Sequence, residues 1–207
     1  MVNDLIWNPD EIRIPSHTLV AICGTANSGK TTFVQKAFND EQIICSDSVL
    51  ENFANQLVRI TEKDLQLTPS SEHWEEISNH LGRIAYLKTQ DALLSMVFQS
   101  SQENSITVFD SVHYNFPDRL GTLLRYSNFF ENIYLIVINP PLEEIKSRKL
   151  KTVSPNLKAM GFKFPDERDI LNQYYTLKNQ LTSKQVSIGV SKAFVLENPN
   201  NFKIEFI

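Results

Sequence analysis

One short stretch constrains the fold of this chain more than any other, Gly24-Thr25-Ala26-Asn27-Ser28-Gly29-Lys30-Thr31. It fits the pattern G-x-x-x-x-G-K-[ST], known as the P-loop or Walker A motif, which lies between a buried strand and a helix. Residues 18–23 before it are typical of a buried strand. Residues 32–38 after it carry apolar side chains at helical spacing. The order of strand, glycine loop and helix therefore predicts a P-loop, and the alternative is a glycine turn followed by a chance lysine.

Each fixed position of this loop has a physical reason. Gly24 and Gly29 let the backbone approach a ligand where a Cβ atom would block it. The amides from Gly24 to Thr32 can then form a concave anion site, to which the helix N-terminus adds its partial positive charge. We expect Lys30 to reach the β- and γ-phosphates of a bound nucleotide, and the Thr31 hydroxyl to bind Mg²⁺.

The composition is that of an ordinary globular protein. The chain has 207 residues, of which 42% are hydrophobic and 21% charged, so we expect a single domain over residues 1–207. No apolar run approaches the roughly 20 residues of a membrane span, and Met1 to Leu5 has no basic segment typical of a secretory signal. Two cysteines are too few for a disulfide framework, so we expect a reducing cytoplasm. The net charge of −4 argues against a broad basic face for nucleic acid.

The predicted elements alternate between strands and helices, which favours a three-layer α/β fold with a mainly parallel sheet flanked by helices. Residues 1–16 are predicted to be a lead-in, 61–72 a polar break, and 151–164 a segment without a regular element. We expect strands at 18–23, 42–46, 105–110, 133–138, 192–196 and 202–206, and helices at 30–38, 48–59, 72–98, 117–127, 139–150 and 165–184.

Ligands of such sheets bind beyond the carboxyl ends of the strands, which here are Gly24, Asp47, Asp110 and Asn139. Asp47 is a candidate general base that accepts the proton of an attacking hydroxyl, and its alternative role is a helix N-cap. Asp110 is a candidate acid for Mg²⁺, and its alternative role is in a turn. The two acids compete for these roles, and the sequence does not separate base from metal ligand.

The segment 146–164 is basic and holds no acid up to Lys163. We predict a mobile lid that covers a triphosphate, with Arg148 as its main contact, whereas the alternative is a solvated flexible loop. His113 and Arg119 are weaker candidates for the same site. The basic residues of the segment are Lys146, Arg148, Lys149, Lys151, Lys158 and Lys163. No companions at ligand spacing accompany His17, His73 and His80, so we predict no metal site built from protein groups alone.

The order of four segments resembles the 5′-polynucleotide kinase family of P-loop phosphotransferases over about residues 17–180. The resemblance implies a kinase-type P-loop NTPase fold, ATP, Mg²⁺ and transfer of the γ-phosphate to a 5′-hydroxyl end of RNA or DNA. It also implies Asp47 as general base, Lys30 and Thr31 on phosphates and metal, and Arg148 as the lid arginine. The segments are Gly24–Thr31, Ile43-Ile44-Cys45-Ser46-Asp47, Val108-Phe109-Asp110-Ser111 and the run from Leu142 to Arg148.

The chain departs from that family at three places. Leu50 stands where the family usually has an arginine, three residues after the base. Asp110-Ser111-Val112-His113 replaces Asp-Ala-Thr-Asn, and Arg148 is the one arginine between Lys146 and Phe164. Two further functions therefore stay open: a kinase for a small molecule such as a nucleoside, sugar or antibiotic, and a nucleotide-binding switch or ATPase without a phosphoryl acceptor. The oligomeric state and the base of the donor nucleotide stay open as well.

Overall fold

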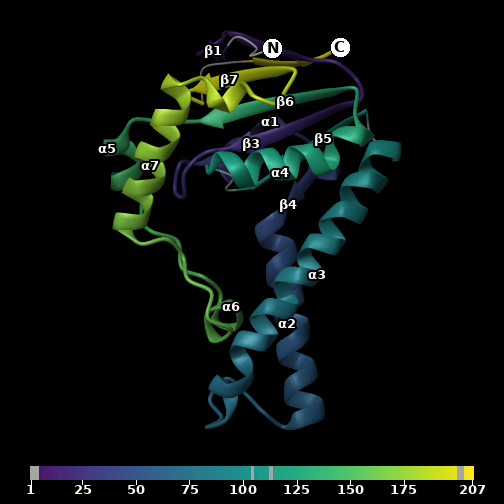
Figure 1. Cartoon of the computed structure of the whole chain (residues 1–207), viewed down its shortest axis with the longest axis vertical. Helices are drawn as coiled ribbons and strands as arrows, with labels where there is room; N and C mark the ends of the chain where they lie inside the picture. The colour runs from purple at the N-terminus through teal and green to yellow at the C-terminus, as the bar shows by residue number, and fades with distance from the viewer. Residues whose placement is uncertain (1–4, 104, 112–113, 200–202) are drawn as a thin grey trace. The chain divides into compact units, whose positions relative to one another are not determined.

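A six-stranded sheet holds the elements on either side of the loop. The computed structural model describes residues 5–103, 105–111, 114–199 and 203–207. The strand order is β1-β7-β6-β3-β5-β4, and the pairs β1·β7, β7·β6, β6·β3 and β3·β5 are all parallel (Figure 1). The strands are β1 Leu5–Trp7, β3 Thr18–Cys23, β4 Ile43–Cys45, β5 Ile106–Asp110, β6 Asn132–Ile138 and β7 Lys192–Leu196.

The central strands are buried along their whole length, as expected of a parallel sheet covered on both faces. Every residue of β3 and of β5 is buried. Their register pairs Ile22 with Asp110, and the register of β3 with β6 pairs Cys23 with Val137. The carboxyl ends of these three neighbouring strands are therefore level, which brings the residues that follow them to the same edge of the sheet.

Helices lie on both faces of this sheet, so the predicted three-layer arrangement of an α/β fold is present. On one face, Phe33 and Val34 of α1 (Lys30–Ala37) belong to the same core cluster as Val20 and Ile136. Side chains of neighbouring residues in a strand point to opposite faces. Accordingly Phe109 meets Tyr126 of α4 (Phe116–Tyr126) on the other face, with ring centroids 5.3 Å apart.

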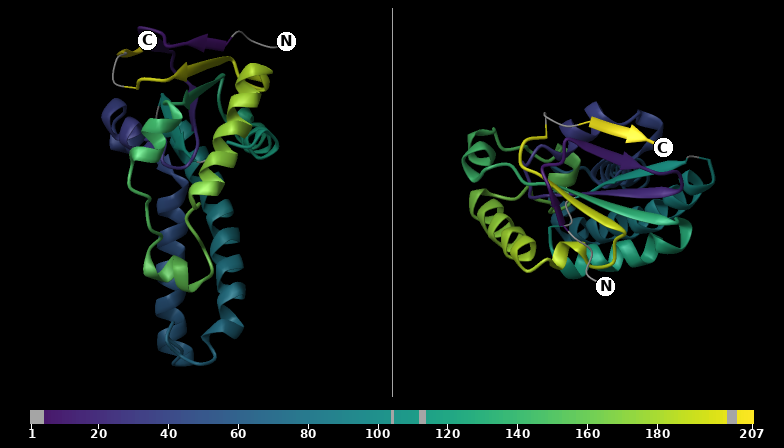
Figure 2. Two further views of the ribbon diagram at one scale, coloured as in Figure 1. Left: turned by 90° about the vertical axis from the view of Figure 1, so that its left-hand side faces the viewer. Right: turned by 90° about the horizontal axis from the view of Figure 1, so that it is seen from above.

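The first core cluster also includes Ile12 and Ile14 of β2 (Glu11–Ile14). This strand pairs in parallel with β8 (Lys203–Phe206) to form a separate two-stranded sheet. Figure 2 shows both small strands beside the strands of the larger sheet in the view from above. The remaining elements around the sheet are α5 Leu142–Ser147, α7 Glu167–Thr182 and the short 3-10 helices Asp40–Gln42, Ser127–Phe129 and Gln185–Ser187.

The chain divides into two compact units, each with its own core. The sheet unit comprises the described residues of Met1–Ile44, Met96–Leu150 and Pro165–Ile207, and the helical unit comprises Cys45–Ser95 and Lys151–Phe164. The helical unit contains α2 (Ser46–Leu65), α3 (Trp74–Glu103) as far as Ser95, and α6 (Pro155–Ala159). The single domain that the sequence predicts over residues 1–207 stays a prediction.

The core of the helical unit joins α6 to the two long helices. Trp74 is buried and donates its indole N–H to the carbonyl of Ala159 at 2.8 Å. Gly82 of α3 leaves room for the Met160 carbonyl, which would lie 2.8 Å from an added Cβ. The buried residues of this core are Ala54, Val58, Trp74, Ala85, Leu157 and Met160.

Three sequence-based predictions of elements are wrong in detail. The lead-in contains β1 and β2, because each finds a parallel partner strand near the other end of the sequence. The helix predicted at 48–59 begins at Ser46 and continues to Leu65, so it takes up part of the predicted polar break. The segment 151–164 contains α6, because Leu157 and Met160 are buried in the core of the helical unit.

None of the helices in the described part of the chain is long and apolar enough to span a membrane. Both cysteines are described, and neither forms a disulfide.

Candidate functional site

The predicted loop lies between β3, which ends at Cys23, and α1, which begins at Lys30. Its two fixed glycines allow close approach of protein atoms. A Cβ on Gly24 would lie 2.6 Å from the carbonyl oxygen of Ile138, and a Cβ on Gly29 would lie 2.7 Å from Nη1 of Arg148. Gly29 also has φ of 91°, in the left-handed region that favours glycine. Both positions therefore require glycine in this structure.

The N-terminus of α1 is not capped by the side chain of its N-cap residue. Gly29 is the N-cap and offers no side chain, and the first turn, Lys30 to Thr32, contains no acid. The first amides of a helix have no partner within the helix, and they carry a partial positive charge. This end of α1 therefore suits an anion.

Lys30 places its ammonium group on the loop itself. The residue is 7% exposed, and its Nζ donates to the carbonyl oxygens of Thr25 at 2.7 Å and Gly24 at 3.2 Å. A buried ammonium group needs such acceptors because it has lost its hydration. The positive charge is thus held next to the uncapped start of α1.

Thr31, in the first turn of α1, meets Asp110 at the end of β5. The Thr31 hydroxyl donates to Oδ2 of Asp110 at 3.0 Å, and Asp110, the last residue of β5, is 4% exposed. A hydroxyl and a carboxylate oxygen side by side are hard oxygen donors of the kind that Mg²⁺ prefers. Mg²⁺ usually takes one or two protein ligands and completes its shell with phosphate and water, so this pair fits a magnesium–nucleotide site.

Three buried polar atoms in or beside the loop have no hydrogen-bond partner among the described residues. They are Thr25 Oγ1, Ser28 Oγ and Asn139 Oδ1. Thr25 and Ser28 belong to the loop, and Asn139 directly follows Ile138, whose carbonyl approaches Gly24. Most buried polar groups in proteins are hydrogen-bonded, so exceptions that gather at one loop point to an absent partner. The hydroxyls could donate to a bound anion.

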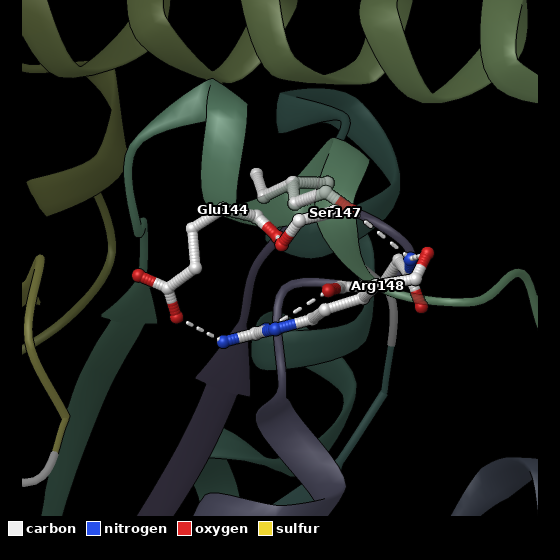
Figure 3. Close-up of polar contacts among 5 residues, drawn as sticks. Glu144, Ser147 and Arg148 are labelled. Atoms are coloured by element: carbon white, nitrogen blue, oxygen red, sulfur yellow. Dashed lines mark hydrogen bonds and ion pairs between the residues drawn. The ribbon is translucent and has the colours of Figure 1, made fainter.

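Arg148 lies against the loop in the sheet unit. Its Nη1 donates to the carbonyl of Asn27 at 2.9 Å, and its Nη2 contacts the carboxylate of Glu144, as Figure 3 shows. In return, Nδ2 of Asn27 donates to the carbonyls of Arg148 at 3.0 Å and Ile145 at 3.1 Å. Asn27 has φ of 65°, which asparagine tolerates better than most residues. The residues after α5 are therefore fixed to the loop.

Gln173 is a contact of the loop that the sequence did not reveal. Its Oε1 accepts from the backbone N–H of Ala26 at 2.8 Å, although the two residues are 147 positions apart. A usable signal exists in the pattern of α7, where four of the five buried positions, 170, 173, 177 and 181, follow helical spacing. Three of them are apolar, so a glutamine at the fourth indicates a specific partner.

Behind the loop, Cys23 contacts a buried arginine. Nη1 of Arg119 lies 3.8 Å from the sulfur of Cys23, and Nη2 donates to Gln180 at 3.0 Å. Burial raises the pKa of the Cys23 thiol, while the positive charges of Arg119 and Lys30 oppose this rise. Arg119, predicted as a weaker ligand candidate, is thus 2% exposed and packed under the loop.

The structure brings together most, but not all, of the predicted site residues. Gly24 to Thr32, Asp110 and Arg148 share the sheet unit, whereas Asp47 belongs to the helical unit. Asp47 is exposed in the first turn of α2, and Cys45 is the N-cap, so the alternative role of Asp47 as N-cap is wrong. Its role as general base stays a prediction. His113 lies outside the described residues.

The residues of the predicted lid are divided between the two units of the chain. Lys146, Arg148 and Lys149 belong to the sheet unit, whereas Lys151, Lys158 and Lys163 belong to the helical unit. The latter three are exposed around α6, whose Leu157 is buried. Within the described ranges, no three His, Cys, Asp or Glu residues are grouped so that they could hold a metal ion by themselves.

No protein-family model matches this chain, and no curated protein matches it.

Proposed function

We propose that this chain is an ATP-dependent phosphotransferase that moves the γ-phosphate to a hydroxyl group, with Mg²⁺ as cofactor. The observation that carries the proposal is the 3.0 Å contact between the Thr31 hydroxyl and Asp110, next to the uncapped N-terminus of α1. A magnesium–nucleotide complex needs an anion site and hard oxygen ligands side by side. This corner of the sheet unit offers both.

The residues of the loop take distinct roles in this proposal. The amides from Gly24 to Thr32, except that of Ala26, which donates to Gln173, bind phosphate oxygens. Lys30 leaves the carbonyls of Gly24 and Thr25 to contact the phosphates. Thr31 and Asp110 would hold Mg²⁺, which offsets negative charge on the transferred group. Arg148 needs to exchange only Glu144 for a phosphate oxygen, since its guanidinium already lies beside Gly29.

We further propose that the acceptor is the 5′-hydroxyl end of RNA or DNA and that Asp47 is the general base. Asp47 accepts the hydroxyl proton as the acceptor oxygen bonds to the γ-phosphorus, and the bond to the bridging oxygen breaks to release ADP. This assignment rests on the order of Asp47 and the P-loop in the sequence. The exposed position of the Asp47 carboxylate is compatible with it.

A second candidate function is phosphorylation of a small molecule, and one observation favours it. Leu50 is partly buried and packs against the core of the helical unit. It therefore offers no charge for the phosphate of a polynucleotide at the position where the resembling kinases carry an arginine. The net charge of −4 agrees with a substrate less charged than a nucleic acid.

The deciding experiment offers γ-labelled ATP with 5′-hydroxyl RNA and DNA oligonucleotides, and separately with a panel of nucleosides, sugars and other hydroxyl metabolites. The wild type is compared with Asp110→Asn and Asp47→Asn. Asp64→Asn, on the exposed surface near the end of α2, serves as the control for a lost charge. We expect label on the oligonucleotides, its near loss with Asp47→Asn, and a higher Mg²⁺ requirement with Asp110→Asn.

The other outcomes separate the alternatives. Label on a metabolite alone would establish the small-molecule kinase, and hydrolysis of ATP that no acceptor accelerates would establish an ATPase or switch. Absence of nucleotide binding at millimolar ATP and Mg²⁺ would refute the phosphotransferase proposal as a whole.

A further inference from the structure

Gln173 occupies a position where a helix normally carries an apolar residue. It belongs to the buried side of α7 with Ile170 and Leu177, and it is 7% exposed. Burial of a carboxamide costs free energy unless its groups find hydrogen-bond partners. The bond from the Ala26 amide to Oε1 satisfies the oxygen of this side chain.

The same bond fixes which way the carboxamide faces. A backbone N–H can only donate, so the atom of Gln173 that faces Ala26 must be the oxygen and not the nitrogen. The two N–H groups of Nε2 therefore point away from the Ala26 amide. None of the hydrogen bonds among the described residues involves Nε2.

Two hydroxyl groups of the loop, like the N–H groups of Gln173, can donate hydrogen bonds to acceptor atoms of a ligand. The hydroxyls of Thr25 and Ser28 are buried without a partner among the described residues. Each hydroxyl can donate one hydrogen bond, as Nε2 of Gln173 can donate two. A ligand that offers several acceptor oxygens and no donors, such as a phosphate chain, would satisfy all three side chains.

We propose that Gln173 is a nucleotide-binding residue that recognises the terminal phosphate. In this arrangement Oε1 keeps the Ala26 N–H, and Nε2 donates to an oxygen of the terminal phosphate. The inner phosphates take the amides at the start of α1, whereas the Ala26 amide is already occupied. Because Gln173 bonds to Ala26 and not to the amides at the start of α1, we assign it to a phosphate that extends beyond those amides. The inference rests on the proposed nucleotide binding and adds a neutral contact that distinguishes ATP from ADP.

The test compares the affinities of Gln173→Met for a non-hydrolysable ATP analogue and for ADP, measured by calorimetry with Mg²⁺. Methionine keeps the size of the side chain and removes both its donor and its acceptor. We expect the affinity for the ATP analogue to fall about tenfold or more, as for the loss of a hydrogen bond to a charged group, and the affinity for ADP to change less than about twofold. Gln180→Met is the matched control, because Gln180 is equally buried on α7 and bonds to Arg119 instead of the loop.

A second variant, Gln173→Glu, covers the case in which methionine prevents folding. Glutamate keeps an oxygen for the Ala26 N–H and replaces the donating NH₂ by an acceptor, so the loss for the ATP analogue should again exceed the loss for ADP. Gln180→Glu controls for the added charge. Thermal unfolding of each variant checks that it is folded, so that the affinities compared are those of folded proteins.

Four results would overturn the inference. Equal losses for both nucleotides would mean that Gln173 only supports the loop, and tighter binding by Gln173→Met would mean that it blocks the Ala26 amide. If the wild type binds neither nucleotide, the proposed function fails and this inference fails with it. Binding of both nucleotides without a difference between the variants leaves the proposed function standing and refutes only the role of Gln173.

Discussion

The first turns of α1 and α7 are built in opposite ways. At α7, the Asp166 carboxylate accepts from the amide of Asp169 at 2.8 Å, and the Asp169 side chain accepts from the amide of Asp166. At α1, Gly29 offers no side chain and the first turn holds no acid. One helix places carboxylates at its own positive end, whereas the other has neither a capping side chain nor an acid there. Helices α2, α4 and α5 also begin without a side-chain cap, but each carries an acid in its first turn, so the difference from α7 teaches that the missing acid sets α1 apart from them.

The largest effect is expected from removal of the positive charge of Lys30, beside the uncapped N-terminus of α1. Lys30→Met should lower phosphate transfer by about 10²–10³-fold, because contacts that offset charge on the transferred group contribute on that scale. The rate of transfer from labelled ATP measures it. Lys36→Met removes a lysine from the exposed side of the same helix and should leave the rate unchanged. A similar loss in both variants would show that the charge acts from a distance and not at the loop.

An acid introduced in the first turn of α1 should make the N-terminus of this helix resemble that of α7. Thr32 is exposed in the first turn, so Thr32→Glu should raise the free energy of unfolding by about 0.3–1 kcal/mol through the helix dipole. The same carboxylate should weaken ATP binding about tenfold, or about 1.4 kcal/mol, because it competes with phosphate for the helix end. Denaturant titration and calorimetry measure the two effects. Gln35→Glu, one turn further on, is the control, and unchanged ATP affinity in Thr32→Glu would refute the comparison.

Removal of the N-cap carboxylate of α7 should lower the stability of the protein and leave its ATP affinity unchanged. Asp166→Ala should lower the free energy of unfolding by about 1 kcal/mol, the usual cost of a lost N-cap. ATP affinity should stay the same, since Gln173 lies nearly two turns after the N-cap residue Asp166. Arg168→Ala, in the same exposed turn but outside the cap, should change stability by less than about 0.5 kcal/mol. A loss of ATP affinity in Asp166→Ala would show that α7 transmits changes at its start to the loop.

The smallest effect is expected at the ion pair on Arg148. Glu144→Gln should tighten ATP binding by no more than about fivefold, because such partly exposed pairs contribute about 0–1 kcal/mol. The side chains of Arg148 and Glu144 are 31% and 48% exposed. Glu143→Gln removes the same charge one residue away, from a pair with Lys146. Calorimetric titration with ATP compares the two variants, and equal effects would assign the change to net charge and not to Arg148.

The local part of the site could be predicted from the sequence. Strand β3 and strand β7 have the predicted bounds, and Asp110 ends its strand as expected. These predictions depend on short runs of buried residues and on a loop motif whose parts are consecutive. Patterns of this kind consist of residues that are close in the sequence, so they can be recognised without knowledge of the tertiary structure.

The long-range part could not be predicted, because no local pattern encodes it. Gln173 meets Ala26 across 147 positions, and Asn27 bonds to two carbonyls after β6 that any residue could supply. The helix α6 was missed because its five residues are too few to show a period, and tertiary burial of Leu157 decides its conformation. The role of Asp47 likewise depends on an arrangement of chain segments that its neighbours do not determine.

The pairing of β2 with β8 has a consequence for synthesis. Glu11 pairs with Lys203, so β2 leaves the ribosome about 190 residues before its partner strand exists. At about 5–20 residues per second, this interval lasts about 10–40 s. During that time Ile12 and Ile14, both fully buried in the finished fold, lack the strand that pairs with them. The nascent chain therefore carries an unpaired strand edge through most of its translation, and such an edge is open to pairing with other extended segments.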